Sequence, residues 1–187
     1  MHSQVLVSSV YSRWAITGLA ALVFQVSTSA HAQVGCTLLQ PAEIESVLTE
    51  WAAEGKAKPF SGATDNSSGV SFDTCHSEIV KPQGNLRVTV IIVKNLPIAG
   101  DVAISTRNAA LAREGQWKVE GAKFEEKTVG KARCTRYGRP GVPAHSVCAI
   151  PDAKGYIEVE LIAPTQKDTP SMEAVGTLVH KANGGLH

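Results

Sequence analysis

The fold is decided by residues 36–48, which read CTLLQPAEIESVL. This is the first stretch with the pattern of a folded protein, because Cys36 and two leucines lead directly into a predicted helix. Pro41 begins that helix, since the missing N–H of proline costs nothing at the first helical position. One face has the apolar i, i+3, i+4, i+7 spacing that predicts burial: Ile44, Val47, Leu48 and Trp51. We therefore expect one helix that ends at Gly55 and packs on a sheet.

The segment that precedes this stretch, residues 1–32, is expected to be a signal peptide. Arg13 is its only Lys or Arg, and an apolar run follows over residues 14–26. Ala30 and Ala32 supply the small residues that signal peptidase reads, so cleavage is predicted before residue 33. The apolar run is short for a membrane span, which needs about 20 residues.

Two alternatives to simple cleavage remain at this stage. One is an uncleaved membrane anchor, because the lead before the apolar run is long and weakly basic. The other is lipoprotein processing at Cys36, since Gly35-Cys36 is the right final pair, although Gln33 stands where an aliphatic residue is expected.

Charge excludes nucleic acid as the main partner of the remaining domain, residues 33–187. The chain has 18 Lys and Arg against 17 Asp and Glu, and cleavage removes only Arg13 from either set. The domain is therefore formally neutral, whereas binding to phosphate backbones needs a marked basic excess. A single domain in the periplasm or outside the cell is expected.

The four cysteines of an exported chain are interpreted first as two disulfides, for which three pairings exist. We favour Cys36–Cys75, which would tie the first helix to a strand, together with Cys134–Cys148, which would close a hairpin-sized loop. Loops of these lengths predict a stabilisation of about 3–4 kcal/mol each.

The remaining elements follow from periodicity. A polar surface loop is expected over residues 56–68, and strands over residues 70–76 and 86–93 form a hairpin. Strict alternation puts Cys75 on the face opposite Val70 and Phe72, so either this strand bulges or the disulfide lies on the outer side of the sheet.

A second helix is expected over residues 101–114. It would pack on the sheet through a face of small residues: Val102, Ser105, Ala109 and Ala112. A short strand and a loop are expected over residues 116–130, and a last helix begins after Pro170.

The segments 131–137, 144–150 and 156–162 predict a three-strand meander. Its last strand alternates Ile157, Val159 and Leu161, facing inward, with Glu158 and Glu160, facing outward, where cross-strand charge pairing with Lys131 and Arg133 is plausible. The element order predicts an α+β fold, an antiparallel sheet of about five to six strands with helices packed on one face.

The motif Cys-x-Leu-Leu-x-x-x-Glu-Ile at residues 36–44 resembles the opening of small exported bacterial domains of unknown function, several of them lipoproteins. The cysteine in the later strand and the closing stretch AVGTLV at residues 174–179 strengthen the resemblance. Some of those domains are similar to the PsbP-like sheet-and-helix fold. The chain departs from the pattern at Gln40, where such openings usually carry Thr. The resemblance implies a fold and an envelope location, and no activity or functional residue.

No catalytic, metal or cofactor site is predicted. Cys75-His76 and His145-x-x-Cys148 match no recurring zinc-ligand spacing, and disulfides compete for the thiols. Nucleophilic catalysis needs an activated Ser or Cys beside a base, and the sequence has no Gly-x-Ser-x-Gly and no His-Glu-x-x-His.

The best candidate for partner binding is the basic segment 123–139. Its predicted contact residues are Lys131, Arg133, Arg136, Tyr137 and Arg139. If the strands present them on one face, an anionic envelope component or an acidic protein surface would dock there. An ordinary charged sheet face balanced by Glu158 and Glu160 is the structural alternative.

Three functions stay open from the sequence. The first is an exported, non-catalytic binding or structural module of the bacterial cell envelope. The second is an inhibitor or immunity-type partner of a secreted enzyme or toxin. The third is a hydrolase whose site is assembled only in three dimensions.

Overall fold

The computed structural model describes residues 34–66, 68–113 and 118–186. The predicted signal peptide therefore lies outside the described residues. All described helices and strands belong to the unit 31–187. None of these helices is long and apolar enough to cross a membrane.

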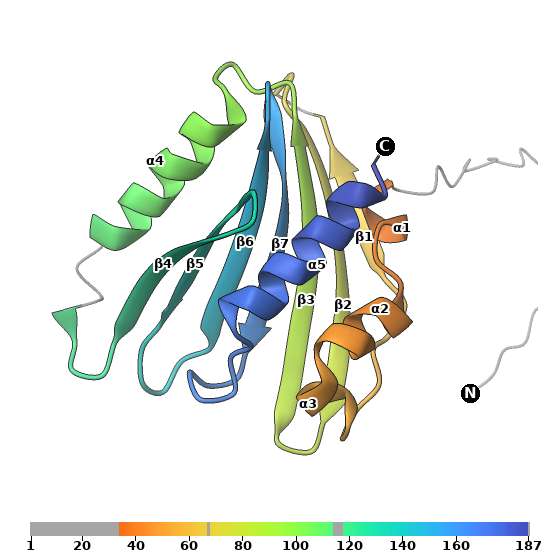
Figure 1. The fold of residues 1–187 in the computed structure, drawn as a ribbon, viewed down its shortest axis with the longest axis vertical. Coiled ribbons are helices and arrows are strands. Elements are labelled where there is room, and N and C mark those ends of the chain that lie inside the picture. The colour runs from red at the N-terminus through yellow and green to blue at the C-terminus, as the bar shows by residue number, and fades with distance from the viewer. Residues whose placement is uncertain (1–33, 67, 114–117, 187) are drawn as a thin grey trace, which may run out of the picture. The chain divides into compact units, whose positions relative to one another are not determined.

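One antiparallel sheet of seven strands, in the order β1-β2-β3-β7-β6-β5-β4, forms the centre of the domain (Figure 1). Its strands are β1 (Ser61–Asp65), β2 (Ser71–Lys81), β3 (Gly84–Lys94), β4 (Lys123–Val129), β5 (Ala132–Gly138), β6 (Ala144–Asp152) and β7 (Gly155–Ala163). The helices are α1 (Val34–Thr37), α2 (Pro41–Val47), α3 (Thr49–Ala52), α4 (Gly100–Arg113) and α5 (Met172–Gly184). The α+β class is confirmed, with more strands than expected.

The core lies between the sheet and the helices α2, α3 and α5, which share one side in Figure 1. The inward alternation of Ile157, Val159 and Leu161 is confirmed, because all three belong to this core. Val175, Leu178 and Val179 of α5 pack against them and are fully buried. Burial of this stripe, at about 25 cal/mol per Å², accounts for the position of α5 across the middle strands.

The prediction that the helices cover one face is wrong for α4. Arg107 of α4 forms an ion pair with Glu158, whose side chain points away from the core face. The packing face of α4 is also not the predicted small-residue face, because Ile104 and Asn108 are buried while Val102 is exposed.

Strand β1 was expected to be a loop. Its sequence, SGATD, has no apolar alternation and every residue is exposed, so periodicity carried no signal for a strand. Backbone pairing with β2 forms it, with Gly62 opposite Cys75. Glycine is needed there, since a Cβ would lie 2.0 Å from the carbonyl oxygen of Thr74.

The first predicted helix is interrupted at Leu48, whose ψ of 54° separates α2 from α3. The N-terminal role of Glu43 is confirmed, because its carboxylate accepts a hydrogen bond from the Gln40 backbone N–H at 2.8 Å. Ile44 of α2 and Trp51 of α3 both belong to the core on either side of this break.

Both favoured disulfides, Cys36–Cys75 and Cys134–Cys148, are present. Cys75 is fully buried on the core face, while Phe72 on the opposite face is partly exposed, so regular alternation without a bulge accommodates the bridge. The Cys36 sulfur is bonded to the Cys75 sulfur. It therefore cannot form the lipid thioether that the lipoprotein alternative requires.

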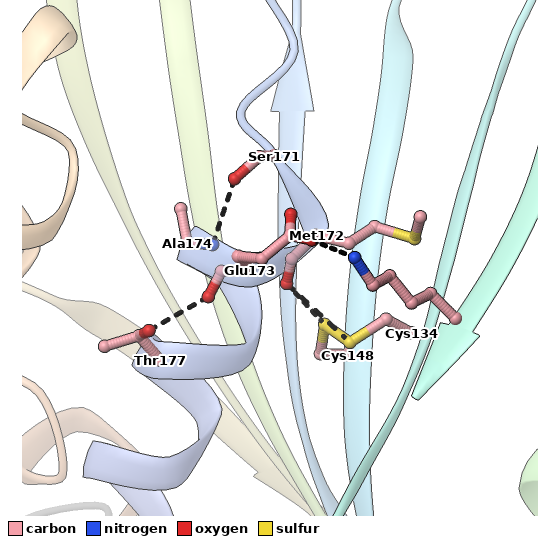
Figure 2. A network of polar contacts seen from close by, with 8 residues as sticks. Cys134, Cys148, Ser171, Met172, Glu173, Ala174 and Thr177 are labelled. Carbon is pink, nitrogen blue, oxygen red and sulfur yellow. Dashed lines mark hydrogen bonds and ion pairs between the residues drawn. A yellow bond between two sulfur atoms is a disulfide. The ribbon is translucent and has the colours of Figure 1, made fainter. Parts of the chain in front are cut away.

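The second disulfide lies beneath the first turn of α5 (Figure 2). Cys134 and Cys148 are direct cross-strand neighbours on β5 and β6. The carbonyl oxygen of Met172 lies 3.8 Å and 3.4 Å from the two sulfurs. Disulfide sulfurs have no proton to donate, so these are oxygen–sulfur contacts that seat the start of α5 on the sheet.

Candidate functional site

The predicted basic segment is divided between the two faces of the sheet. Arg133 and Tyr137 lie on the α4 side, whereas the intervening Arg136 points to the α5 side, as alternation along β5 requires. Lys131 and Arg139 are exposed in the turns at the two ends of β5. The five predicted contact residues therefore do not form one face.

On the α4 side, Arg133 fastens the helix to the sheet. Its Nη1 donates to the Ser105 hydroxyl and, at 3.4 Å, to the carbonyl oxygen of Asp101. A shallow groove of about 540 Å³ lies beside it between α4 and β4. The predicted pairing of Arg133 with Glu158 or Glu160 is absent from the ion pairs of the described residues, because β6 separates β5 from β7.

Glu158 and Glu160 instead belong to a polar cluster below α4. Glu158 is only 6% exposed and pairs with Arg107, so its expected solvent exposure is wrong. The carboxylate of Glu160 lies 2.7 Å from Nδ1 of His145, and the His145 ring stacks on Tyr137 with 4.6 Å between centroids. Burial lowers the pKa of Arg107, while the nearby Tyr156, Tyr137 and Glu160 act in the opposite direction.

This cluster resembles part of an acid–base site, because a carboxylate orients a histidine ring. Nucleophilic catalysis also needs a hydroxyl or thiol within hydrogen-bond reach of the other ring nitrogen. Across the described ranges, no such group is recorded at Nε2 of His145. The arrangement neutralises buried charge between the sheet and α4.

A larger cavity, of about 710 Å³, lies on the α5 side, next to the β2–β3 turn. We call it the Trp51 cavity. It is open to solvent on one side and is lined by α3, the β2–β3 turn, the loop between β7 and α5, and the start of α5. Its apolar walls are Val47, Leu48, Trp51, Pro164, Pro170 and Ala174.

Trp51 connects two walls of this cavity. Its indole Nε1 donates to the carbonyl oxygen of Asp168 at 3.2 Å, and the ammonium of Lys81 lies 4.4 Å from the ring centroid. Sequence periodicity identified Trp51 as a core residue, which is correct, but gave no indication that its edge lines a cavity.

The side chain of Lys81 is more buried than is usual for a lysine, and its ammonium group has fixed partners. Its side chain is 11% exposed, and Nζ donates to the carbonyl oxygen of Glu50 at 2.9 Å. The Glu54 carboxylate lies 3.7 Å away, so the charge of Lys81 has an acidic partner. Glu54 itself is 55% exposed at the rim of the cavity.

Arg136 also lines the cavity, as does the exposed Lys167, and the charge of Arg136 has no recorded acidic partner in the described chain. Its Nη2 donates to the carbonyl oxygens of Gln166 at 3.0 Å and Thr169 at 2.9 Å, both of which are neutral groups. Glu125 lies directly opposite Arg136 in the β4–β5 register, yet it is not among the recorded ion pairs of the described chain. The interior of the cavity therefore has a half-buried, uncompensated positive charge.

Within the described ranges, no group of three or more His, Cys, Asp or Glu residues is placed to hold a metal ion. All four cysteines are in disulfides. No protein-family model and no curated protein matches this chain.

Proposed function

We propose that this protein is an exported, non-catalytic binding module that holds a small ligand in the Trp51 cavity. The observation that carries the proposal is the cavity itself, whose volume of about 710 Å³ falls in the range of small-molecule sites. Such sites combine apolar walls with polar groups that orient the ligand, and this cavity has both, with more polar than apolar residues in its lining. Two disulfides and the predicted signal peptide support work in an oxidising compartment.

The cavity suits a ligand because its polar groups are already fixed. Arg136 is positioned by two carbonyl oxygens, and Trp51 by one. Preorganised groups bind with less loss of conformational entropy than groups that must be ordered by the ligand.

Filling the cavity tests the proposal. Ala174 lines the cavity from the first turn of α5, so Ala174→Phe should occupy its space. Thr177→Phe is the matched control, because Thr177 is exposed on the same helix and does not line the cavity. A library of small acids, amides, alcohols and sugars is screened by ligand-observed NMR against each protein.

Ligands that bind the wild type and Thr177→Phe but not Ala174→Phe are the expected result. If no library member distinguishes the two variants, the cavity is not the ligand site and the proposal is wrong.

Export is tested separately by the intact mass of the protein recovered from the envelope fraction. We expect cleavage before Gln33 and no reaction with iodoacetamide until reductant is added. A full-length mass, or four thiols that react without reductant, would contradict the exported state.

A further inference from the structure

We infer that the ligand of the Trp51 cavity is a small organic acid, whose single carboxylate binds the Arg136 guanidinium. This inference rests on the proposed function and specifies the chemical class of the ligand. The carboxylate would lie at Arg136, and the apolar body of the acid would lie against Leu48, Pro164 and Ala174, which line the same cavity.

The first argument is the state of Arg136. A half-buried guanidinium loses part of its hydration, and this loss is costly unless an anion or sufficient hydrogen bonds replace the water. Only Nη2 is recorded in hydrogen bonds, both to the loop before α5. The N–H groups of Nε and Nη1 have no recorded partner in the described chain and remain for a ligand. Charge-assisted bonds from Arg to a carboxylate are about twice as strong as neutral ones.

The second argument is the distribution of charge around the cavity. Its acidic residues, Glu50, Glu54 and Asp168, are all exposed at the rim. Glu54 is near Lys81, and Asp168 accepts a hydrogen bond from the Thr165 hydroxyl at 2.6 Å. The two cations that are not exposed, Lys81 and Arg136, lie further inside, and of these only Arg136 lacks an acidic partner. Lys167 also lines the cavity without a recorded ion pair, but it is exposed, where water and salt screen its charge. The one charge that is both half-buried and uncompensated matches one carboxylate.

The start of α5 strengthens the same preference. The cavity is lined by Ser171 and Ala174 of the N-terminal turn, where the helix dipole favours negative charge. This contribution is secondary, because the Ser171 hydroxyl already accepts a hydrogen bond from the Ala174 N–H.

The third argument is the apolar part of the lining. Leu48 is buried, and it faces the cavity together with prolines from the loop and Ala174 from the helix. These residues form the apolar part of a lining that is otherwise mostly polar, and an alkyl or aryl body would bury its surface against them while its carboxylate binds Arg136. The volume accommodates a short fatty acid or an aromatic acid.

The experiment compares acids with their neutral amides by titration calorimetry at fixed salt. Hexanoate and benzoate are the test probes, hexanamide and benzamide the isosteric controls, and inorganic phosphate the anion control. We expect each acid to bind wild type at least about tenfold tighter than its amide, because charge-assisted hydrogen bonds exceed neutral ones by about 1.4 kcal/mol or more. Phosphate should bind more weakly than either acid.

Variants then assign the effect to one side chain. Arg136→Gln should reduce the acid-to-amide ratio to near one, and Arg136→Lys should restore part of it. Arg139→Gln is the matched control, because Arg139 belongs to the same basic segment but is exposed outside the cavity. The wild-type comparison needs no variant, so the inference stays testable if Arg136→Gln fails to fold.

Each outcome decides a different claim. Equal binding of acid and amide to wild type, abolished by Ala174→Phe, overturns the organic-acid inference and leaves the binding module intact. Phosphate binding as tight as hexanoate also overturns it, since the site would then recognise charge alone. If neither these probes nor the screened library binds, the proposed function fails as well.

Discussion

Arg107 and Glu158 show how a single ion pair can hold an element that has little apolar contact. Glu158 is almost completely buried on the α4 side of the sheet, and Arg107 neutralises it. We expect Arg107→Ala to lower the free energy of unfolding by about 2–3 kcal/mol, because it leaves a buried carboxylate unpaired. Urea denaturation followed by circular dichroism measures the change.

The double variant Arg107→Met/Glu158→Gln is the informative control for this pair. Removing both charges avoids the unpaired carboxylate, so its cost should be smaller than that of Arg107→Ala. A loss below about 0.5 kcal/mol for Arg107→Ala, the range of ordinary surface substitutions, would show that the pair contributes nothing.

Glu45 gives the domain a predictable response to acid. Its carboxylate accepts a hydrogen bond from the Ala57 N–H at 3.0 Å, which lowers the Glu45 pKa below its ordinary 4.5, with a smaller contribution from Lys56. A carboxyl pKa that is lower in the folded state stabilises the fold above the unfolded pKa. This stabilisation is lost as pH falls through the folded-state pKa.

We therefore expect Glu45→Gln to lower stability at pH 7 and to have less effect below pH 4.5. Denaturation midpoints measured from pH 7 to pH 3 test this expectation. Glu120→Gln, at an exposed turn residue, should leave the profile unchanged. A constant difference between Glu45→Gln and wild type across the pH range would contradict the assignment.

The beginning of α5 depends on one hydroxyl. Ser171 is the N-cap residue, and its side chain accepts a hydrogen bond from the Ala174 N–H at 3.2 Å. We expect Ser171→Ala to lower the free energy of unfolding by about 1 kcal/mol. Ser46→Ala is the control, because its exposed hydroxyl donates to the Glu43 carbonyl within a helix and caps no free N–H. Equal losses for the two variants, measured by chemical denaturation, would contradict the capping role.

Periodicity predicted the elements that bury an apolar stripe. The β2–β3 hairpin, the β5–β7 meander and α5 were all identified, because their buried apolar residues recur at the spacing of a strand or a helix. It missed β1, which consists of small, mostly polar residues, and it chose the wrong face of α4, where Ile104 is buried and Arg107 pairs with Glu158 of the sheet.

The sequence predicted only some of the residues of the candidate site. Arg136 was selected as one of several basic residues, but its separation from Arg133 follows from alternation along a strand whose two faces are covered by different helices. Trp51 and Lys81 meet Arg136 only because the loop before α5 folds beside the β2–β3 turn. Such tertiary proximity has no counterpart in the spacing of residues along the chain.

The two disulfides connect different parts of the domain. Cys36–Cys75 spans 39 residues and fastens the segment that contains α2 and α3 to β2. Cys134–Cys148 spans 14 residues and joins neighbouring strands beneath α5. The chain-entropy account assigns about 4 and 3 kcal/mol to loops of these lengths.

The two bridges should also differ in their access to reductant. Cys36 is partly exposed, whereas Cys134 and Cys148 are buried under the first turn of α5. Since thiol–disulfide exchange requires the attacking thiolate to reach a sulfur atom, we expect Cys36–Cys75 to be reduced first under native conditions. Timed reduction, quenching with iodoacetamide and peptide mass analysis give the order directly.

Loss of the first bridge should weaken the Trp51 cavity before it unfolds the sheet. Trp51 follows Cys36 in the segment that this bridge fastens, while the wall formed by α5 rests on the second bridge. We expect Cys36→Ser/Cys75→Ser to lose ligand binding at a denaturant concentration where the far-ultraviolet circular dichroism of the sheet persists. Preferential reduction of Cys134–Cys148 would contradict the predicted order of reduction. Simultaneous loss of both signals would show that the N-terminal helices are held to the sheet by packing and not by the disulfide.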